Sequence, residues 1–175
     1  QGLVAAKDPG VALAYGAAFV SRGNLTIVGT FFALWIVQHG TGELDMSSAE
    51  AQKHAGMIIG IAQSCVLLGA PLFGILADRI NRVNALIITL LISAIGYGST
   101  FFITDPMSQG MIYAAVIIGL GEVGCIISSG VLIAQQTPER YRGAVIGFFN
   151  LSGALGILVA SVVGGALFDS WRESG

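Results

Sequence analysis

One carboxylate lies inside a long apolar run, in the sequence Gly119-Leu120-Gly121-Glu122-Val123-Gly124. A carboxylate among apolar side chains is costly unless it is protonated or paired. Such a group can load and release a proton, or it can contact a cation. Ser129 lies seven residues further on and shares the helical face of Glu122. The pattern therefore predicts either a proton or cation site at Glu122 or a structural ion pair.

The cation that could pair with Glu122 is Arg22, which lies in the polar break Ser21-Arg22-Gly23-Asn24-Leu25-Thr26 of another apolar run. An arginine with lipid on all sides costs several kcal/mol, so Arg22 must face a cavity, a partner or the interface. The run at 11–37 would be about 40 Å long as one helix, so Arg22 could instead extend to the membrane surface. Asn24 and Thr26 are less costly, and they are candidates for contact with a substrate or a neighbouring helix.

The elements that must position these groups follow from the composition. The chain has 175 residues, of which 54% are hydrophobic and only 10% charged, and its mean hydropathy is +0.81. A soluble domain needs more surface charge, and a disordered chain is poor in apolar residues. The sequence therefore predicts an integral membrane protein. A net charge of -2 without a basic block gives no electrostatic footprint for nucleic acid.

Five continuous apolar runs are long enough to cross a bilayer. They must be helical, because backbone groups in lipid have to be satisfied within the segment. We expect an all-α, polytopic helix bundle at 11–168, with a cytoplasmic loop at 1–10 and an extracytoplasmic loop end at 169–175. The predicted spans are 11–37, 55–77, 83–103, 110–134 and 143–168.

Lysine and arginine positions predict the orientation, because these residues are enriched in cytoplasmic loops. Five of them fall on one side of the predicted bundle and two on the other, namely Lys7, Arg79, Arg82, Arg140 and Arg142 against Lys53 and Arg172. We therefore expect a multi-pass protein of the cell's inner (plasma) membrane with a cytoplasmic N-terminus. The odd number of spans also predicts a sixth helix beyond this sequence.

The turn between the second and third predicted spans reads Gly74-Ile75-Leu76-Ala77-Asp78-Arg79-Ile80-Asn81-Arg82. Gly74 would let a neighbouring helix approach closely, and Asp78 could pair with a basic residue or cap a helix. Arg79 and Arg82 would hold the turn in the cytoplasm. A generic positively charged turn is the plainer alternative.

This turn resembles the signature loop of the major facilitator superfamily, which reads Gly-x-Leu-Ala-Asp-Arg-x-Gly-Arg. The chain matches it at six positions and departs at Asn81, where the family usually has glycine; the matches are Gly74, Leu76, Ala77, Asp78, Arg79 and Arg82. The resemblance implies a cytoplasmic latch, formed by Gly74, Asp78, Arg79 and Arg82, that locks helices during the change between inward-open and outward-open states.

Small residues recur along the fifth predicted span at Gly156, Ala160 and Gly164, with Gly165 beside them. Small residues four apart make a smooth helical face for close packing. The family has a fifth-helix motif with glycines at similar spacing, most regular in antiporters, but Ala160 and Ser161 stand where its Gly-Pro pair would be. Helix packing is therefore the preferred interpretation.

The resemblance implies one half of a transporter of this superfamily, with five of its spans present. The first and fourth spans of each half line the central cavity in the family, and they carry Arg22, Asn24, Thr26, Glu122 and Ser129. The fourth predicted span lacks an arginine, and the segment 164–171 resembles the end of an eleventh helix. Both features favour the C-terminal half, helices seven to eleven.

The implied function is secondary active transport of small organic solutes by alternating access, proton-coupled, with efflux slightly favoured over uptake. The implied partners are a small-molecule substrate, the lipid bilayer and the missing half. We expect no cofactor other than the coupling proton and no metal, because His39 and His54 are not clustered.

Two further classes of function are weighed against transport. A structural or assembly subunit of a membrane complex would explain the glycine stripes and the odd span count. An intramembrane enzyme needs converging catalytic groups. It is disfavoured because Glu122 is the only embedded acid well away from the predicted helix ends.

Overall fold

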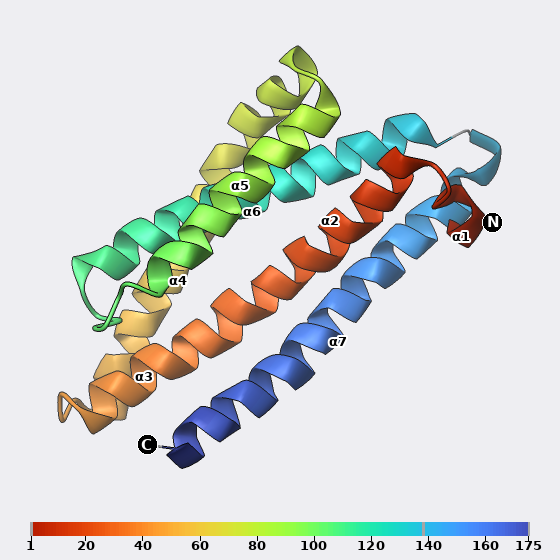
Figure 1. Ribbon diagram of the computed structural model, residues 1–175. Coiled ribbons are helices and arrows are strands. Elements are labelled where there is room, and N and C mark those ends of the chain that lie inside the picture. Colours follow the sequence, from red (N-terminus) through yellow and green to blue (C-terminus); the bar gives the residue numbers. More distant parts are fainter. Residues whose placement is uncertain (1, 138, 175) are drawn as a thin grey trace.

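The computed structural model describes the backbone of residues 2–137 and 139–174 and the side chains of these ranges as far as Ser170. All regular elements within those ranges are helical (Figure 1). In chain order they are α1 (Gly2–Ala5), α2 (Pro9–Thr26), the π-helix η1 (Ile27–Phe32), α3 (Ala33–Gly42), α4 (Ser48–Arg79), α5 (Arg82–Thr100), α6 (Gln109–Gln136), the 3-10 helix η2 (Glu139–Tyr141) and α7 (Arg142–Ser174).

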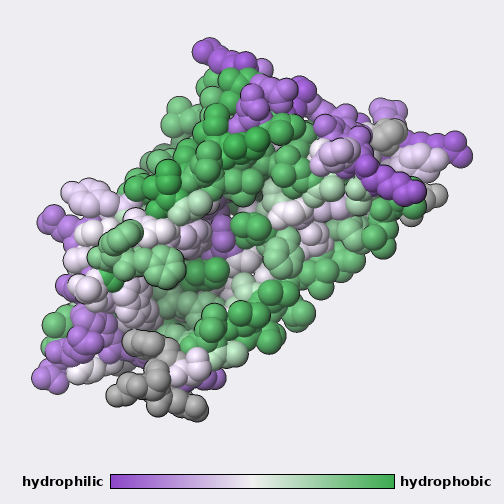
Figure 2. All heavy atoms as spheres, viewed as in Figure 1, coloured by the Kyte–Doolittle hydropathy of each residue, from purple (hydrophilic) through white to green (hydrophobic). Residues whose placement is uncertain are grey.

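Within the described ranges, five helical segments are long and apolar enough to cross a membrane, as the sequence predicts. Their surface agrees with lipid contact, because large apolar side chains such as Leu67 and Leu68 are more than 70% exposed. Figure 2 shows apolar residues over the middle of the bundle and polar residues gathered toward its ends. The spans are Pro9–Gly42, Ser48–Arg79, Arg82–Thr100, Gln109–Gln136 and Glu139–Ser170.

The helix boundaries differ from the predicted ones. The loop expected at 169–175 is helical as far as Ser174, because α7 continues there, and the loop expected at 1–10 contains α1. The second span begins at Ser48, seven residues before its apolar part. Hydropathy marks the part of a helix that lies in lipid, whereas hydrogen bonding continues through polar turns until a capping residue ends it.

Polar side chains explain where three of the helices begin. The Asp8 carboxylate accepts hydrogen bonds from the backbone N–H groups of Gly10 (2.8 Å) and Val11 (3.3 Å), with proline in the first turn of α2. A reciprocal capping box between Ser47 and Glu50 starts α4. Asn81 caps α5. These polar caps fix the turns between the spans.

Of the five spans, α6 is the most buried. It contacts α2, α4 and α5, while α7 lies alongside α2 (Figure 1). The packing on α6 is close because glycines face backbone: a Cβ at Gly119 would meet the carbonyl of Ala62 in α4, and one at Gly121 would meet the backbone of Ser93 in α5. Small residues thus set the distances between helices.

Candidate functional site

A layer of buried polar side chains crosses the bundle between two apolar clusters. One cluster gathers around Val11, Leu86 and Leu132, and the other gathers around Val28 and Ile118. Apart from Thr137 at the end of α6, the buried polar residues lie between members of the two clusters along α2, α5 and α6. They are Ser21 and Asn24 on α2, Thr89 and Ser93 on α5, and Glu122, Cys125, Ser128 and Ser129 on α6.

Glu122 is the charged member of this layer. Its side chain is 0% exposed, and neither carboxylate oxygen has a hydrogen-bond partner among the described residues. The hydroxyl of Tyr97 and the thiol of Cys125 are close enough to interact with it electrostatically. An unpaired carboxylate in such surroundings is strongly disfavoured. The arrangement therefore suits a carboxyl group that carries a proton or meets a cation.

The predicted alternative of an ion pair between Glu122 and Arg22 is absent from the structure. Arg22 is exposed, and its Cγ lies 2.8 Å from the place that a Cβ on Gly153 would occupy. The aliphatic stem of its side chain thus contacts α7. The two embedded charges of the sequence consequently have separate surroundings.

The other predicted cavity residues differ in burial. Asn24 is buried, and Thr26 is partly buried in the next turn. Ser129 is buried, but its hydroxyl donates to the carbonyl oxygen of Cys125 at 2.6 Å within α6. The neighbouring Ser128 is the member whose buried hydroxyl has no partner. Asn24 and Glu122 therefore share one polar layer, whereas the Ser129 hydroxyl is occupied by its own helix.

Sequence reasoning missed the contribution of α5. Tyr97 donates a hydrogen bond to the backbone carbonyl of Asn24 at 3.3 Å, just before the chain enters η1. Its helix also places Thr89 and Ser93 in the polar layer. These three residues are spaced four apart, so they form a polar stripe on one face of an apolar span. That periodicity was the available signal. The π-helix had no sequence signal that we recognise, although such segments are frequent at functional sites.

The predicted latch residues lie at the turn between α4 and α5. Asp78, Arg79 and Arg82 are exposed, and none of them has an ion-pair partner among the described residues. Capping of α5 falls to Asn81, whose Oδ1 accepts from the N–H of Val83 at 2.9 Å. The departure from the family's glycine thus has a local structural role.

Gly74, the first latch residue, faces open space, since a Cβ there would meet nothing within 4 Å. We expected a neighbouring helix to pack closely against Gly74 because glycine is small, but no helix among the described residues does so. A close neighbour at Gly74 would have to come from outside this bundle.

The small residues of α7 line its contact with the first span. A Cβ at Gly156 would collide with the carbonyl of Phe19, and one at Gly164 would meet the ring of Phe31. The Cβ of Ala160 lies 3.6 Å from the corresponding point on Gly23. Gly165 faces open space. Three of the four predicted packing residues are therefore at the interface with α2 and η1.

Two pockets lie away from the polar layer. One of about 450 Å³ is lined by α1, the start of α2, the end of α6 and the start of α7. The other, of about 480 Å³, is lined by aromatic side chains that include Phe31, Trp35 and Phe101. Glu122 lines neither pocket. Within the described residues, no group of three His, Cys, Asp or Glu side chains could hold a metal ion.

Five membrane-spanning helices around a buried polar layer define a polytopic membrane protein. The family model described as Major Facilitator Superfamily matches residues 14–173. The chain therefore belongs to this superfamily of membrane transporters.

Relatives with known names agree with this membership. The chain is 29% identical over 162 residues to the magnetosome protein MamH of Paramagnetospirillum magneticum, which covers 93% of this chain and 37% of that protein. It is 31% identical over 122 residues to the inner membrane metabolite transport protein YgcS of Escherichia coli, covering 67% and 27%. It is 25% identical over 157 residues to the multi-drug resistance efflux pump PmrA of Streptococcus pneumoniae, covering 90% and 37%.

The chain thus spans between 27% and 37% of the length of these three relatives. No solved structure matches the chain significantly.

Proposed function

We propose that this chain is the five-helix part of one half of a secondary active transporter, which moves small organic solutes across the membrane by alternating access. Membership of the superfamily supports transport, and relatives named for metabolite transport and for drug efflux support small organic solutes. The observation that carries the mechanism is Glu122, a fully buried carboxyl that has no hydrogen-bond partner in the part of the chain that the structure describes.

Glu122 is the proton carrier in this proposal. A protonated carboxyl is neutral and tolerates the surrounding apolar clusters, whereas a carboxylate requires water or a cation. Opening the bundle to one side supplies water, so Glu122 releases its proton there and takes up another when the opposite side opens. Arg22, Asn24 and Thr26 on the first span, and Ser129 on the fourth, are the candidate contacts for the solute.

The rest of the cavity comes from a second half of the protein. The relatives are two to four times longer than the matched region, which leaves room for such a half. The open space at Gly74 and the exposed Asp78, Arg79 and Arg82 suit the proposed latch, because a helix of the other half could pack on that surface. We place this chain as helices seven to eleven in the inner membrane, with its N-terminus in the cytoplasm.

The proposal is tested by Glu122→Gln in the full-length protein. The probe is ethidium, an organic cation suited to efflux assays, in inverted membrane vesicles with an imposed pH gradient. The amide keeps the shape of the carboxyl but cannot exchange a proton. We expect ethidium transport by the variant to lose its dependence on the pH gradient.

The matched control is Glu139→Gln, which removes an exposed carboxylate from η2. It should behave as the unaltered protein does. Unchanged dependence on the pH gradient in Glu122→Gln would remove Glu122 from the mechanism. Folding of both variants is checked by thermal unfolding in detergent.

A second candidate function is that of a subunit in a membrane complex. The similarity to proteins named as magnetosome proteins favours it, because that name refers to the magnetosome and not to a solute. Purification of the native full-length protein in mild detergent separates the two candidates. A stoichiometric complex with other proteins, together with no transport of any tested solute, would favour the subunit.

A further inference from the structure

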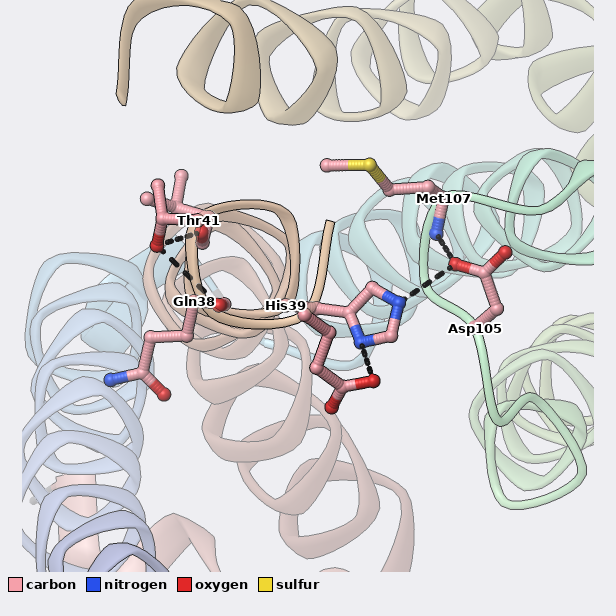
Figure 3. Close-up of polar contacts among 7 residues, drawn as sticks. Gln38, His39, Thr41, Asp105 and Met107 are labelled. Atoms are coloured by element: carbon pink, nitrogen blue, oxygen red, sulfur yellow. Dashed lines mark hydrogen bonds and ion pairs between the residues drawn. The ribbon is translucent and has the colours of Figure 1, made fainter. Parts of the chain in front are cut away.

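His39 lies between two carboxylates at the end of the first span (Figure 3). Its Nδ1 is 3.3 Å from Oε2 of Glu43, and its Nε2 is 3.2 Å from Oδ1 of Asp105. The imidazole is 12% exposed, so the protein surrounds most of it. Both ring nitrogens therefore face an oxygen that accepts hydrogen bonds.

This geometry distinguishes the two protonation states of His39. A neutral imidazole has one N–H, and its other nitrogen is an acceptor. An ionised carboxylate can only accept hydrogen bonds. The neutral ring can therefore donate to one carboxylate, but its other nitrogen then faces the second carboxylate acceptor to acceptor, which is unfavourable. The imidazolium has two N–H groups and can donate to Glu43 and to Asp105 at once. Both contacts are favourable together only in the imidazolium form.

The two carboxylates belong to different parts of the chain. Glu43 ends α3, four residues after His39, so that contact stays within one segment. Asp105 belongs to the connection between α5 and α6, and its Oδ1 also accepts from the N–H of Met107 at 2.8 Å. His39 thus ties the end of the first span to the loop that leads into α6. Glu122 lies on that same helix.

Close packing around Gly40 supports this attachment. A Cβ there would lie 2.5 Å from the terminal methyl of Met107 and 3.0 Å from the Cβ of Ala51 in α4. The carbonyl of Gly40 accepts from the N–H of Met46 at 3.0 Å. The loop that follows α3 and the loop between α5 and α6 therefore both contact the turn that carries His39.

Other charged groups near this end have different roles. The α4 helix packs against α3 and carries Glu50, Lys53 and His54 in its first two turns, and the preceding loop carries Asp45. Glu50 forms a hydrogen bond with Ser47, and the Nε2 of His54 is buried and has no partner among the residues described. Among the described residues, only Glu43 and Asp105 form ion pairs with His39. They bind opposite nitrogens of the ring, so the three groups cannot converge on one metal ion.

We propose that His39 is a proton-sensitive clamp that holds the loop between α5 and α6 against the end of the first span. The protonated ring binds Asp105 and keeps the loop closed. Loss of the proton removes the charge of the ring and leaves one ring nitrogen facing a carboxylate without a donor, so the ring holds the loop less tightly and the loop opens more often. Imidazoles in general change charge between about pH 5 and 8. The clamp therefore closes as the pH on that side of the membrane falls.

The test is hydrogen–deuterium exchange of the loop at 101–108 in the full-length protein, at about pH 5.5 and about pH 8. Rates are corrected for the intrinsic pH dependence of amide exchange. We expect roughly five-fold greater protection at the lower pH, the equilibrium factor that corresponds to about 1 kcal/mol. His39→Gln should abolish this difference. His54→Gln, which removes the other histidine of this end, should retain it.

Asp105→Asn provides a second variant that should fold. Its amide oxygen can still accept from the N–H of Met107, so the turn remains while the charge is lost. This variant should also lose the difference in protection. Equal protection at both pH values in the unaltered protein, or a persisting difference in His39→Gln or Asp105→Asn, would overturn the clamp. Exchange does not require transport, so failure of the clamp and failure of the proposed transport mechanism are separate results.

Discussion

A methyl group at Gly156 would collide with the backbone of α2. A Cβ there would lie 2.8 Å from the carbonyl carbon and 3.1 Å from the Cα of Phe19, and closer still to the carbonyl oxygen. These are backbone atoms of a helix, so they cannot rotate away as a flexible side chain could. We therefore expect Gly156→Ala to force α2 and α7 apart.

The magnitude follows from the distances. Carbon atoms in ordinary contact are about 3.5–4.0 Å apart, so the two helices must separate by roughly 1 Å at this point. Overpacking of this kind costs about 1–3 kcal/mol. Replacing a helical glycine by alanine also gains up to about 1 kcal/mol of helix propensity. The same gain applies at Gly165 of α7, where a Cβ would meet nothing within 4 Å. The difference between Gly156→Ala and Gly165→Ala therefore isolates the packing cost.

The assay is thermal unfolding of the full-length protein in detergent, followed with a thiol-reactive fluorescent dye. Cys125 is a free thiol with 0% exposure, so it reacts when the bundle opens. For a domain of this size, each kcal/mol shifts the midpoint by about 2–4 °C. We expect Gly156→Ala to unfold roughly 2–12 °C below Gly165→Ala. Equal midpoints would refute the close backbone approach of α2 and α7.

Two further predictions use the same thermal assay. Asn81→Ala should destabilise the protein by about 0.5–2 kcal/mol, because the Asn81 side chain caps α5 at the N–H of Val83. The control is Asn84→Ala, which changes an exposed residue in the same turn. Equal midpoints of the two variants would argue against the cap. Gly121→Ala should cost about 1–3 kcal/mol relative to Gly130→Ala on the same helix. Its Cβ would lie 2.5 Å from the backbone nitrogen and 2.7 Å from the Cα of Ser93, whereas a Cβ at Gly130 meets nothing within 4 Å. A midpoint at or above that of Gly130→Ala would contradict this packing.

The fold was largely predictable because membrane insertion depends on local composition. An apolar run of sufficient length with few charges has to be a helix in lipid, wherever it lies in the bundle. All five spans followed from this rule, and so did the embedding of Glu122. The residue order in the turn at Asp78 likewise indicated the superfamily, and the family model confirms it.

The candidate site was predictable only in part, because its composition depends on which helical faces meet. The sequence identified Glu122 and Asn24, and both lie in the buried polar layer. It offered Arg22 as a partner for Glu122, but the stem of the Arg22 side chain contacts α7, and no ion pair joins these two residues. Tyr97 was absent from the predicted site, although its hydroxyl reaches the carbonyl of Asn24.

The sequence by itself thus determined the number of spans, their helical state and the presence of an embedded acid, since each depends on residues close together in the chain. The tertiary structure decided the neighbours of each charge, the π-helix in the first span and the contact between His39 and Asp105. Those features depend on the rotation and crossing of helices, which are set by the sum of many contacts between distant segments. A local pattern shows that a polar group is embedded, but only the packed bundle determines what that group can touch.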